Sequence, residues 1–221
     1  MQRQRLSREQ SREQTRERLL AASHTVFTQK GFALASVEEI TTAAGYSRGA
    51  FYSNFDDKTE LFFELLRRES VEIEAEFHRM LQAPQVDVEQ LREQITAYYS
   101  QLFQQDACSL LWMEAKIVAV RDEKFRAKLN QFQEERHKQI AGFVDTFAAI
   151  SGVTPSAPSH EIAIGLSALC EGVSFAHRCD PQRIDADTAA AVLSFFLKSV
   201  IAMPAAVNDK PVSKKKVGGR S

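Results

Sequence analysis

The sequence predicts an all-α protein, and three features of the chain lead to that prediction. Apolar residues recur at spacings of three and four along most of the 221 residues, which is the period of a helix with one buried face. No segment alternates apolar and polar residues with the β-branched enrichment that is typical of strands. Glycine and proline separate the periodic segments, as expected where helices end.

Three helices are expected in residues 1–58. The first covers residues 8–30 and ends before Gly31, which occupies the position that glycine favours after a helix C-terminus. Ser36 begins a short second helix, and Glu39 three residues later completes a capping box.

A glycine turn separates the second helix from the third. Gly45 ends the second helix, and Ser47 caps a third helix over residues 48–55. Two short helices joined in this way have the length and spacing of a helix-turn-helix. In that motif the second helix enters the major groove of DNA while the preceding helix crosses the backbone.

Six further helices are expected in the rest of the chain. Their expected ranges are residues 58–80, 88–105, 109–120, 122–150, 159–177 and 185–203. Residues 204–221 have no apolar period and are expected to form a basic, disordered tail.

The net charge of −1 argues against a nucleic-acid binder until the charges are placed along the chain. Residues 1–58 carry nine basic and seven acidic residues, and residues 59–204 carry fourteen and twenty-one. Residues 205–221 carry five basic residues and one acidic residue. Basic ends around an acidic body fit an N-terminal part that meets phosphates, although a solvated charged face gives a similar pattern.

Other classes of protein find little support in the sequence. There is no GxSxG, HExxH, P-loop or GxGxxG motif, so we expect no enzyme, no cofactor and no metal site. The charged N-terminus lacks the apolar region of a secretory signal, and no run is apolar enough to span a membrane, which favours a cytoplasmic protein. Cys108, Cys170 and Cys179 show no CxxC spacing and are expected to be reduced thiols, with a redox-sensing pair as the alternative.

The third helix carries side chains that suit contact with DNA. Arg48 can fork onto guanine O6 and N7 or onto a phosphate, and Ser47 can donate to a phosphate or a base edge. Gly49 and Ala50 leave a thin surface that can approach the bases closely. The neighbouring residues that we expect to contact DNA are Ser36, Tyr52, Ser53, Asn54 and Lys58.

Residues 36–62, SVEEITTAAGYSRGAFYSNFDDKTELF, resemble the DNA-binding signature of the tetracycline-repressor (TetR) family. The matching elements are Gly31-Phe32, Val37, Ile40, Ala44-Gly45, Ser47-Arg48-Gly49-Ala50, Phe51-Tyr52, Phe55, Lys58 and Leu61-Phe62. The likeness covers about fifty residues. Tyr46 stands where a small aliphatic residue is usual, Asn54 where a histidine is common, and Ala35 where a threonine is frequent.

The resemblance implies a role for each part of the motif. Phe51 and Phe55 would hold the recognition helix in the core, residues 47–50 would read bases, and Ser36, Tyr52, Asn54 and Lys58 would clamp phosphates. At or before the start of the first helix, Arg3, Arg5 and Arg8 either track phosphates or a minor groove or form a solvated arm.

The resemblance also implies the organisation of the whole chain. Residues 1–58 would form the helix-turn-helix domain, residues 59–203 an effector-binding and dimerisation domain, and residues 204–221 the tail. The last two helices carry small residues beside large apolar ones, which suits a homodimer on double-stranded operator DNA, with an intramolecular hairpin as the alternative. The implied function is a repressor released from a palindromic operator by a small molecule.

Aromatic residues of the middle helices are the candidates for a ligand cavity, although such a set is also typical of plain core. The candidate ligand contacts are Tyr98, Phe103, Trp112, Met113, Phe132, His137 and Phe143. Further polar candidates are Glu114, Glu171 and His177. This composition favours an apolar or amphipathic effector. A redox-sensing regulator, an activator, and an architectural DNA-binding protein that uses the basic tail remain open alternatives.

Overall fold

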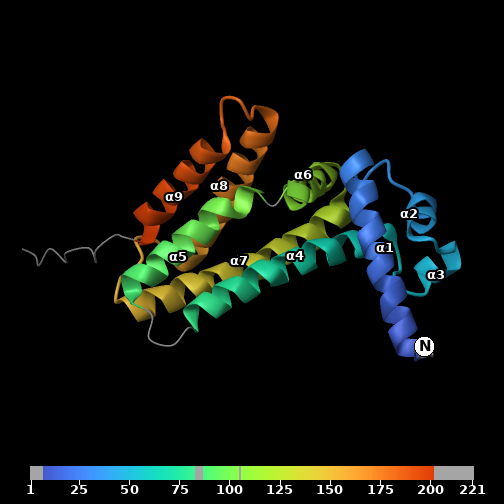
Figure 1. The fold of residues 1–221 in the computed structure, drawn as a ribbon, viewed down its shortest axis with the longest axis horizontal. Helices are drawn as coiled ribbons and strands as arrows, with labels where there is room; N and C mark the ends of the chain where they lie inside the picture. The colour runs from blue at the N-terminus through green and yellow to red at the C-terminus, as the bar shows by residue number, and fades with distance from the viewer. Residues whose placement is uncertain (1–6, 83–86, 105, 202–221) are drawn as a thin grey trace, which may run out of the picture.

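The computed structural model describes residues 7–82, 87–104 and 106–201, and its regular elements over these ranges are all helical (Figure 1). The α-helices are α1 (Arg8–Lys30), α2 (Val37–Ala44), α3 (Arg48–Tyr52), α4 (Lys58–Leu81), α5 (Val88–Gln101), α6 (Asp106–Arg121), α7 (Glu123–Ser151), α8 (Ser159–Cys179) and α9 (Ala186–Ile201). A short 3₁₀ helix, η1 (Leu102–Gln104), follows α5. The prediction of an all-α protein is confirmed, while Arg3, Arg5 and the expected tail at 204–221 lie outside the described residues.

The start and stop signals near the N-terminus hold in the structure. Gly31 and Gly45 have φ angles of 79° and 73°, which L side chains adopt at a cost and glycine adopts freely. The Ser36 hydroxyl and the Glu39 carboxylate form the expected capping box at the start of α2.

Three helix boundaries differ from the prediction by three or more residues. The third helix ends at Tyr52 rather than at residue 55, because the side chains of Ser53 and Asn54 both donate to the Ala50 carbonyl. The fifth helix gives way to a 3₁₀ turn after Gln101, and α6 begins at Asp106, three residues earlier than expected.

Phenylalanine rings form the core at the N-terminal end of the molecule. Phe32 packs edge-on against Phe62 with ring centroids 4.8 Å apart, and Phe27 packs against Phe62 at 5.3 Å. Phe125 of α7 adds a ring 5.3 Å from Phe32. The same buried cluster extends through α4, α6 and the first half of α7, so residues on both sides of position 58 share one core.

The remaining helices form the body. Figure 1 shows α4 and α7 side by side, extending away from α1, α2 and α3, with α8 and α9 above them in the view. Helix α5 packs against α9, and α8 packs against both α7 and α9. A second buried cluster lies among them and includes Leu91, Tyr99, Phe147 and Leu193. The body therefore has an apolar interior of its own beside the N-terminal core.

Candidate nucleic-acid interface and ligand cavity

Hydrogen bonds at both ends of the turn fix the angle between α2 and α3. The Gly45 N–H donates to Thr42 O at 3.1 Å, and the Tyr46 N–H donates to Thr41 O at 2.9 Å. Ser47 then caps α3, since its hydroxyl accepts from the Ala50 N–H at 3.3 Å. A short helix depends on such capping bonds, because its first four N–H groups and last four C=O groups have no partner within the helix.

The two faces of α3 have opposite characters. Phe51 is fully buried and Phe55, just after the helix, is nearly so, which anchors α3 to the core as the resemblance implies. The opposite face exposes Ser47, Arg48 and Gly49 near the start of the helix. Tyr52 and Ser53 are exposed at its end, and Ala50 is half-buried. The residues expected to read bases therefore share the open side of the helix-turn-helix.

Three of the expected phosphate contacts have partners within the protein. The Ser36 hydroxyl belongs to the capping box, and the buried Asn54 amide donates to Ala50 O at 2.8 Å. Lys58 Nζ donates to Phe32 O and Ala35 O, each at 2.6 Å, and lies 4.5 Å from the centroid of the Phe32 ring. Burial lowers the pKa of Lys58. A phosphate contact by any of these three stays a prediction.

Arg16 ties the end of α3 to the neighbouring helices, which the sequence analysis did not anticipate. Its Nη1 donates to Asn54 O at 3.0 Å, and its guanidinium carbon lies 4.3 Å from the Phe55 ring centroid. Its Nη2 lies 3.3 Å from a carboxylate oxygen of Glu64 on α4. No local sequence pattern predicts these contacts, because they join residues about forty positions apart.

A cavity of about 110 Å³ lies in the body among α4, α5, α7, α8 and α9. Its lining is chiefly apolar and comes from Ser70, Ile73, Glu74, Phe77, Leu81, Ile95, Tyr99, Leu102, Arg136, Gln139, Ile140, Phe143, Val144, Phe147, Leu166, Ser167, Cys170 and Leu197. An apolar recess with a few convergent polar groups is typical of a small-molecule site.

A second recess of about 60 Å³ adjoins the cavity and shares Arg136 and Cys170 with it. Arg136 Nη1 lies 3.3 Å from a carboxylate oxygen of Glu171, and Lys116 pairs with the other oxygen. The Arg136 guanidinium carbon also lies 4.7 Å from the Trp112 ring centroid. The charged side chains between the two recesses, Arg136, Lys116 and Glu171, therefore pair with one another.

The seven predicted ligand contacts do not lie together in the structure. Phe143 lines the cavity, and Trp112 and Met113 line the second recess. The other four, Tyr98, Phe103, Phe132 and His137, line neither of the two.

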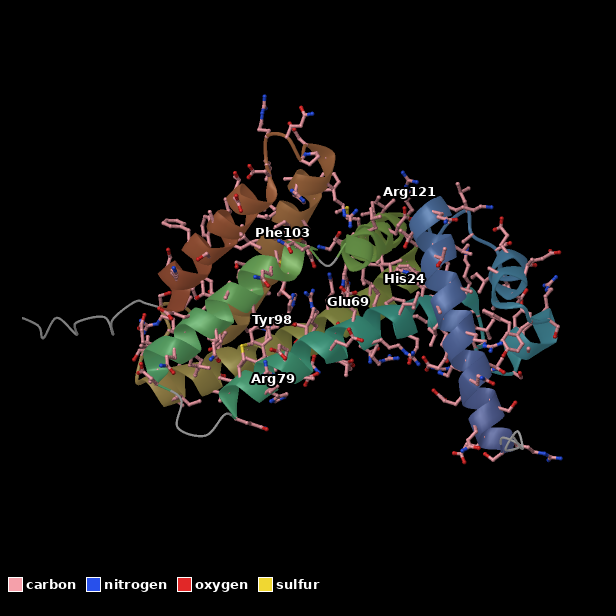
Figure 2. All side chains as sticks on the ribbon, viewed as in Figure 1. His24, Glu69, Arg79, Tyr98, Phe103 and Arg121 are labelled. Carbon is pink, nitrogen blue, oxygen red and sulfur yellow. The ribbon has the colours of Figure 1, made fainter. Side chains whose placement is uncertain are left out.

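Packing accounts for the positions of these four residues. Figure 2 shows Tyr98 on α5, and its ring packs edge-on against Phe77 at 5.2 Å. Phe103 packs against the His177 ring at 5.1 Å, and Phe132 is buried beside Trp112 and Phe63. The His137 ring faces that of His160, with centroids 6.0 Å apart.

Most residues of the lining, including Ser70, Arg136, Ser167 and Cys170, are not among the ligand contacts predicted from the sequence. A signal for it existed on the two long helices. Positions 70, 73, 74, 77 and 81 of α4, and 136, 139, 140, 143, 144 and 147 of α7, each follow one helix face at spacings of three and four.

The described cysteines do not form a redox pair within one chain. Cys170 is largely buried, and burial raises the pKa of its thiol to about 11. Cys179 is exposed at the end of the same helix. Nine residues span roughly 13.5 Å along a helix, whereas a disulfide needs Cα atoms within about 7 Å. The Cys108 side chain lies outside the described residues.

The outer face of α8 and α9 is apolar and open. Phe195 is 65% exposed, Phe175 53% and Ile164 43%. Gly165 and Gly172 lie on the same side of α8, and a Cβ built at either would meet no atom within 4 Å. Large exposed rings beside small residues are typical of a surface that another helix covers.

Over the described residues, metal clusters and membrane-spanning helices are both absent. They contain no group of three or more histidine, cysteine or acidic side chains placed to hold a metal ion. Within the same ranges, no helix combines the length and apolar character needed to cross a membrane.

Two protein families match the chain. The family described as "Bacterial regulatory proteins, tetR family" matches residues 19–65, which include the helix-turn-helix. The family described as "BetI-type transcriptional repressor, C-terminal" matches residues 87–202, more than half of the chain.

Individual relatives agree with these matches. The HTH-type transcriptional regulator AcrR of Shigella flexneri is 41% identical over 56 residues, which are 25% of this chain and 26% of AcrR, so the likeness spans about a quarter of that relative. A TetR-family regulator from Rhodococcus sp. has a TM-score of 0.69 at 23% identity and covers 86% of this chain and 99% of its own.

A complex of the Stenotrophomonas maltophilia repressor SmeT with triclosan has a TM-score of 0.62 at 21% identity, over 89% of this chain and 98% of its own. At such identities the likeness to solved structures shows a shared fold. The two family matches go further, because they cover both the helix-turn-helix and most of the body. The chain belongs to the TetR family of bacterial regulatory proteins.

Proposed function

We propose that the protein is a sequence-specific transcriptional repressor that binds operator DNA as a homodimer and leaves it when a small molecule binds the body. The observation that carries the proposal is the exposed face of α3. Ser47, Arg48 and Gly49 stand free of the core there, while Phe51 and Phe55 hold the opposite face. That arrangement suits insertion of α3 into a major groove.

The apolar outer face of α8 and α9 supports the homodimer. A second copy of the chain would cover Phe175 and Phe195, which are costly to leave in water. Two-fold symmetry then presents two α3 helices to one side of the duplex. Half-sites about 34–36 Å apart, one helical turn of DNA, would fit such a pair.

The cavity supports a small apolar effector, and α4 supports its coupling to DNA. Helix α4 begins at Lys58, beside the helix-turn-helix, and contributes Ser70, Ile73 and Phe77 to the cavity lining. SmeT, which has a similar fold, binds triclosan, a small organic molecule. An effector lowers operator affinity only if it binds better to the conformation that fits DNA less well.

The proposed regulator works where the chromosome is, in the cytoplasm, and needs no enzymatic activity. Selection from a random pool of duplex DNA tests the proposal. We expect enrichment of one inverted repeat, because two identical α3 helices read two identical half-sites. Recovery of unrelated sequences, with the full chain and native dimer intact, would contradict sequence-specific binding.

A further inference from the structure

The hydroxyl of Ser167 is unusual among the polar groups of the cavity. Ser167 lies on α8, lines the cavity and is only 5% exposed. No hydrogen-bond partner of its Oγ is found in the described part of the chain. A buried hydroxyl without a partner is unfavourable, and native proteins leave few of them.

Another serine on the same helix shows the ordinary arrangement. Ser174, two helical turns later, donates its hydroxyl to Cys170 O at 2.8 Å. Ser167 does not close the corresponding bond, although it is similarly buried. Its hydroxyl therefore keeps both its donor and its acceptor capacity for a molecule in the cavity.

The neighbouring polar groups are engaged within the protein. The Tyr99 hydroxyl donates to Leu166 O at 2.8 Å, and the Ser70 hydroxyl donates to Leu66 O at 3.0 Å. The Gln139 amide donates to a Glu74 carboxylate oxygen at 3.0 Å. A ligand that enters the cavity thus meets apolar side chains and one hydroxyl whose hydrogen bonds are not yet made.

The lining favours an uncharged ligand, because its chiefly apolar side chains would solvate an ion poorly. Arg136 is paired with Glu171, which Lys116 also contacts, and the Glu74 carboxylate accepts from Gln139, so the charged groups of the lining already have partners within the protein. The buried Cys170 thiol stays protonated at neutral pH. An ion buried among apolar side chains without a counter-charge is strongly unfavourable.

The volume sets the scale of the ligand. The cavity measures about 110 Å³. An engineered apolar cavity of roughly 150 Å³ in another protein binds benzene, so a molecule built on one ring is the appropriate size. The open side of the cavity leaves room for a substituent directed toward solvent.

We propose that the effector of this protein is an uncharged, largely apolar molecule of about one ring whose single polar group hydrogen-bonds to Ser167 Oγ. The inference rests on the proposed ligand-responsive function and deepens it by naming the chemical class of the effector. Ser167 is thereby the residue that sets specificity within an otherwise apolar lining.

Phenol and toluene provide the direct test, since they differ by a hydroxyl in place of a methyl group at nearly constant size. Calorimetric titration of the full chain gives a dissociation constant for each probe. In Ser167→Ala the preference for phenol over toluene should fall about tenfold, the effect expected from a lost buried hydrogen bond. In the matched control Ser174→Ala, whose hydroxyl bonds within its own helix, the preference should not change.

Benzoate and benzylammonium test the exclusion of charge, and both should bind at least about tenfold more weakly than phenol. Val144→Phe, which fills the cavity, should weaken phenol and toluene alike and so locate the binding. Ser167→Cys keeps a small side chain and provides a second variant if Ser167→Ala unfolds. An unchanged phenol preference in both Ser167 variants, tight binding of either ion, or no effect of Val144→Phe would overturn the inference.

These titrations contain no DNA, so their failure differs from failure of the proposed function. A protein that enriches an inverted repeat but shows no Ser167-dependent preference remains a repressor with a different effector. A protein that binds phenol through Ser167 but enriches no DNA sequence has the ligand site without the proposed function.

Discussion

Glu114 Oε2 on α6 accepts a hydrogen bond from the backbone N–H of Phe32, 3.1 Å away in space and 82 residues earlier in the chain. Phe32 belongs to the turn between α1 and α2, which Lys58 holds from the other side. Helix α6 also lines the second recess through Trp112 and Met113. Helix α6 thus contacts both the turn that leads into the helix-turn-helix and the recess beside the cavity.

Removal of the Glu114 carboxylate should weaken the link between α6 and the turn that joins α1 to α2. We expect Glu114→Ala to lower the free energy of unfolding by about 1–3 kcal/mol, since the partly buried Phe32 N–H loses a charged acceptor. The ratio of operator affinities without and with effector should also move toward one. Urea unfolding and DNA titrations measure the two effects. Glu123→Ala is the control, because the Glu123 side chain is 91% exposed; equal behaviour of the two variants would refute the connection.

Gly31 should be sensitive to substitution for two reasons, and a second glycine separates them. A Cβ at Gly31 would lie 2.9 Å from Glu114 Oε1, and its φ of +79° is unfavourable for alanine. Gly152 has a similar φ of +68° but no atom within 4 Å of its Cβ position.

Gly31→Ala should therefore destabilise the fold more than Gly152→Ala, by about 1–2 kcal/mol, as the Glu114 carboxylate turns away from Phe32. In a double-mutant cycle, Gly31→Ala should cost less in the Glu114→Ala background. Strict additivity of the two substitutions would show that Gly31 and Glu114 do not interact.

Substitution of Lys58 tests whether its ammonium supports the fold or contacts a DNA phosphate. Because its ammonium donates to Phe32 O and Ala35 O, we expect Lys58→Met to lower both stability and operator affinity without changing the salt dependence of binding. A direct phosphate contact would instead reduce the slope of log affinity against log salt by about one. Titrations of the selected duplex at several salt concentrations decide between them, and a reduced slope would restore the role that the family resemblance implies.

Cys170 makes the fold sensitive to alkaline pH. Burial raises the pKa of its thiol from 9.0 to about 11, so the stabilising effect is complete below pH 9 and is lost as the pH rises toward 11. At pH 10 the loss is about 1.4 kcal/mol relative to neutral pH.

We expect the difference in unfolding free energy between pH 7.5 and pH 10 to shrink by that amount in Cys170→Ser. The exposed Cys179 provides the control variant, Cys179→Ser, which should behave like the parent protein. The prediction fails if all three proteins lose the same stability. Tyr99, whose pKa is raised chiefly by burial and further by Cys170, is present in all three proteins.

Local signals were sufficient to predict the helix-turn-helix. The capping box at Ser36 and the left-handed glycine at position 45 act within a few residues, so the sequence alone determines where α2 begins and ends. The end of α3 was misplaced because Asn54 turns its amide back onto the Ala50 carbonyl, a choice that depends on burial.

The cavity lining could not be predicted in the same way. Aromatic residues are its expected signal, but Phe103 and Phe132 fill space in the cores. The cavity lies where smaller side chains such as Ser70, Ser167 and Cys170 leave room between α4 and α8. Which small residues face one another depends on how distant helices pack, and periodicity within one helix carries no such information.

DNA titration with the selected duplex tests the central claim most directly. Fluorescence anisotropy would compare that duplex with a scrambled one of the same composition, using the parent protein, Arg48→Ala and the charge-matched control Arg183→Ala. Arg183 lies between α8 and α9 with an 85% exposed side chain, away from α3. We predict that Arg48→Ala weakens binding to the selected duplex by about 10- to 100-fold with the dimer intact, while Arg183→Ala binds like the parent. Equal affinity of the parent for both duplexes, or parent-like binding by Arg48→Ala, would contradict the assignment of α3 as the element that reads DNA.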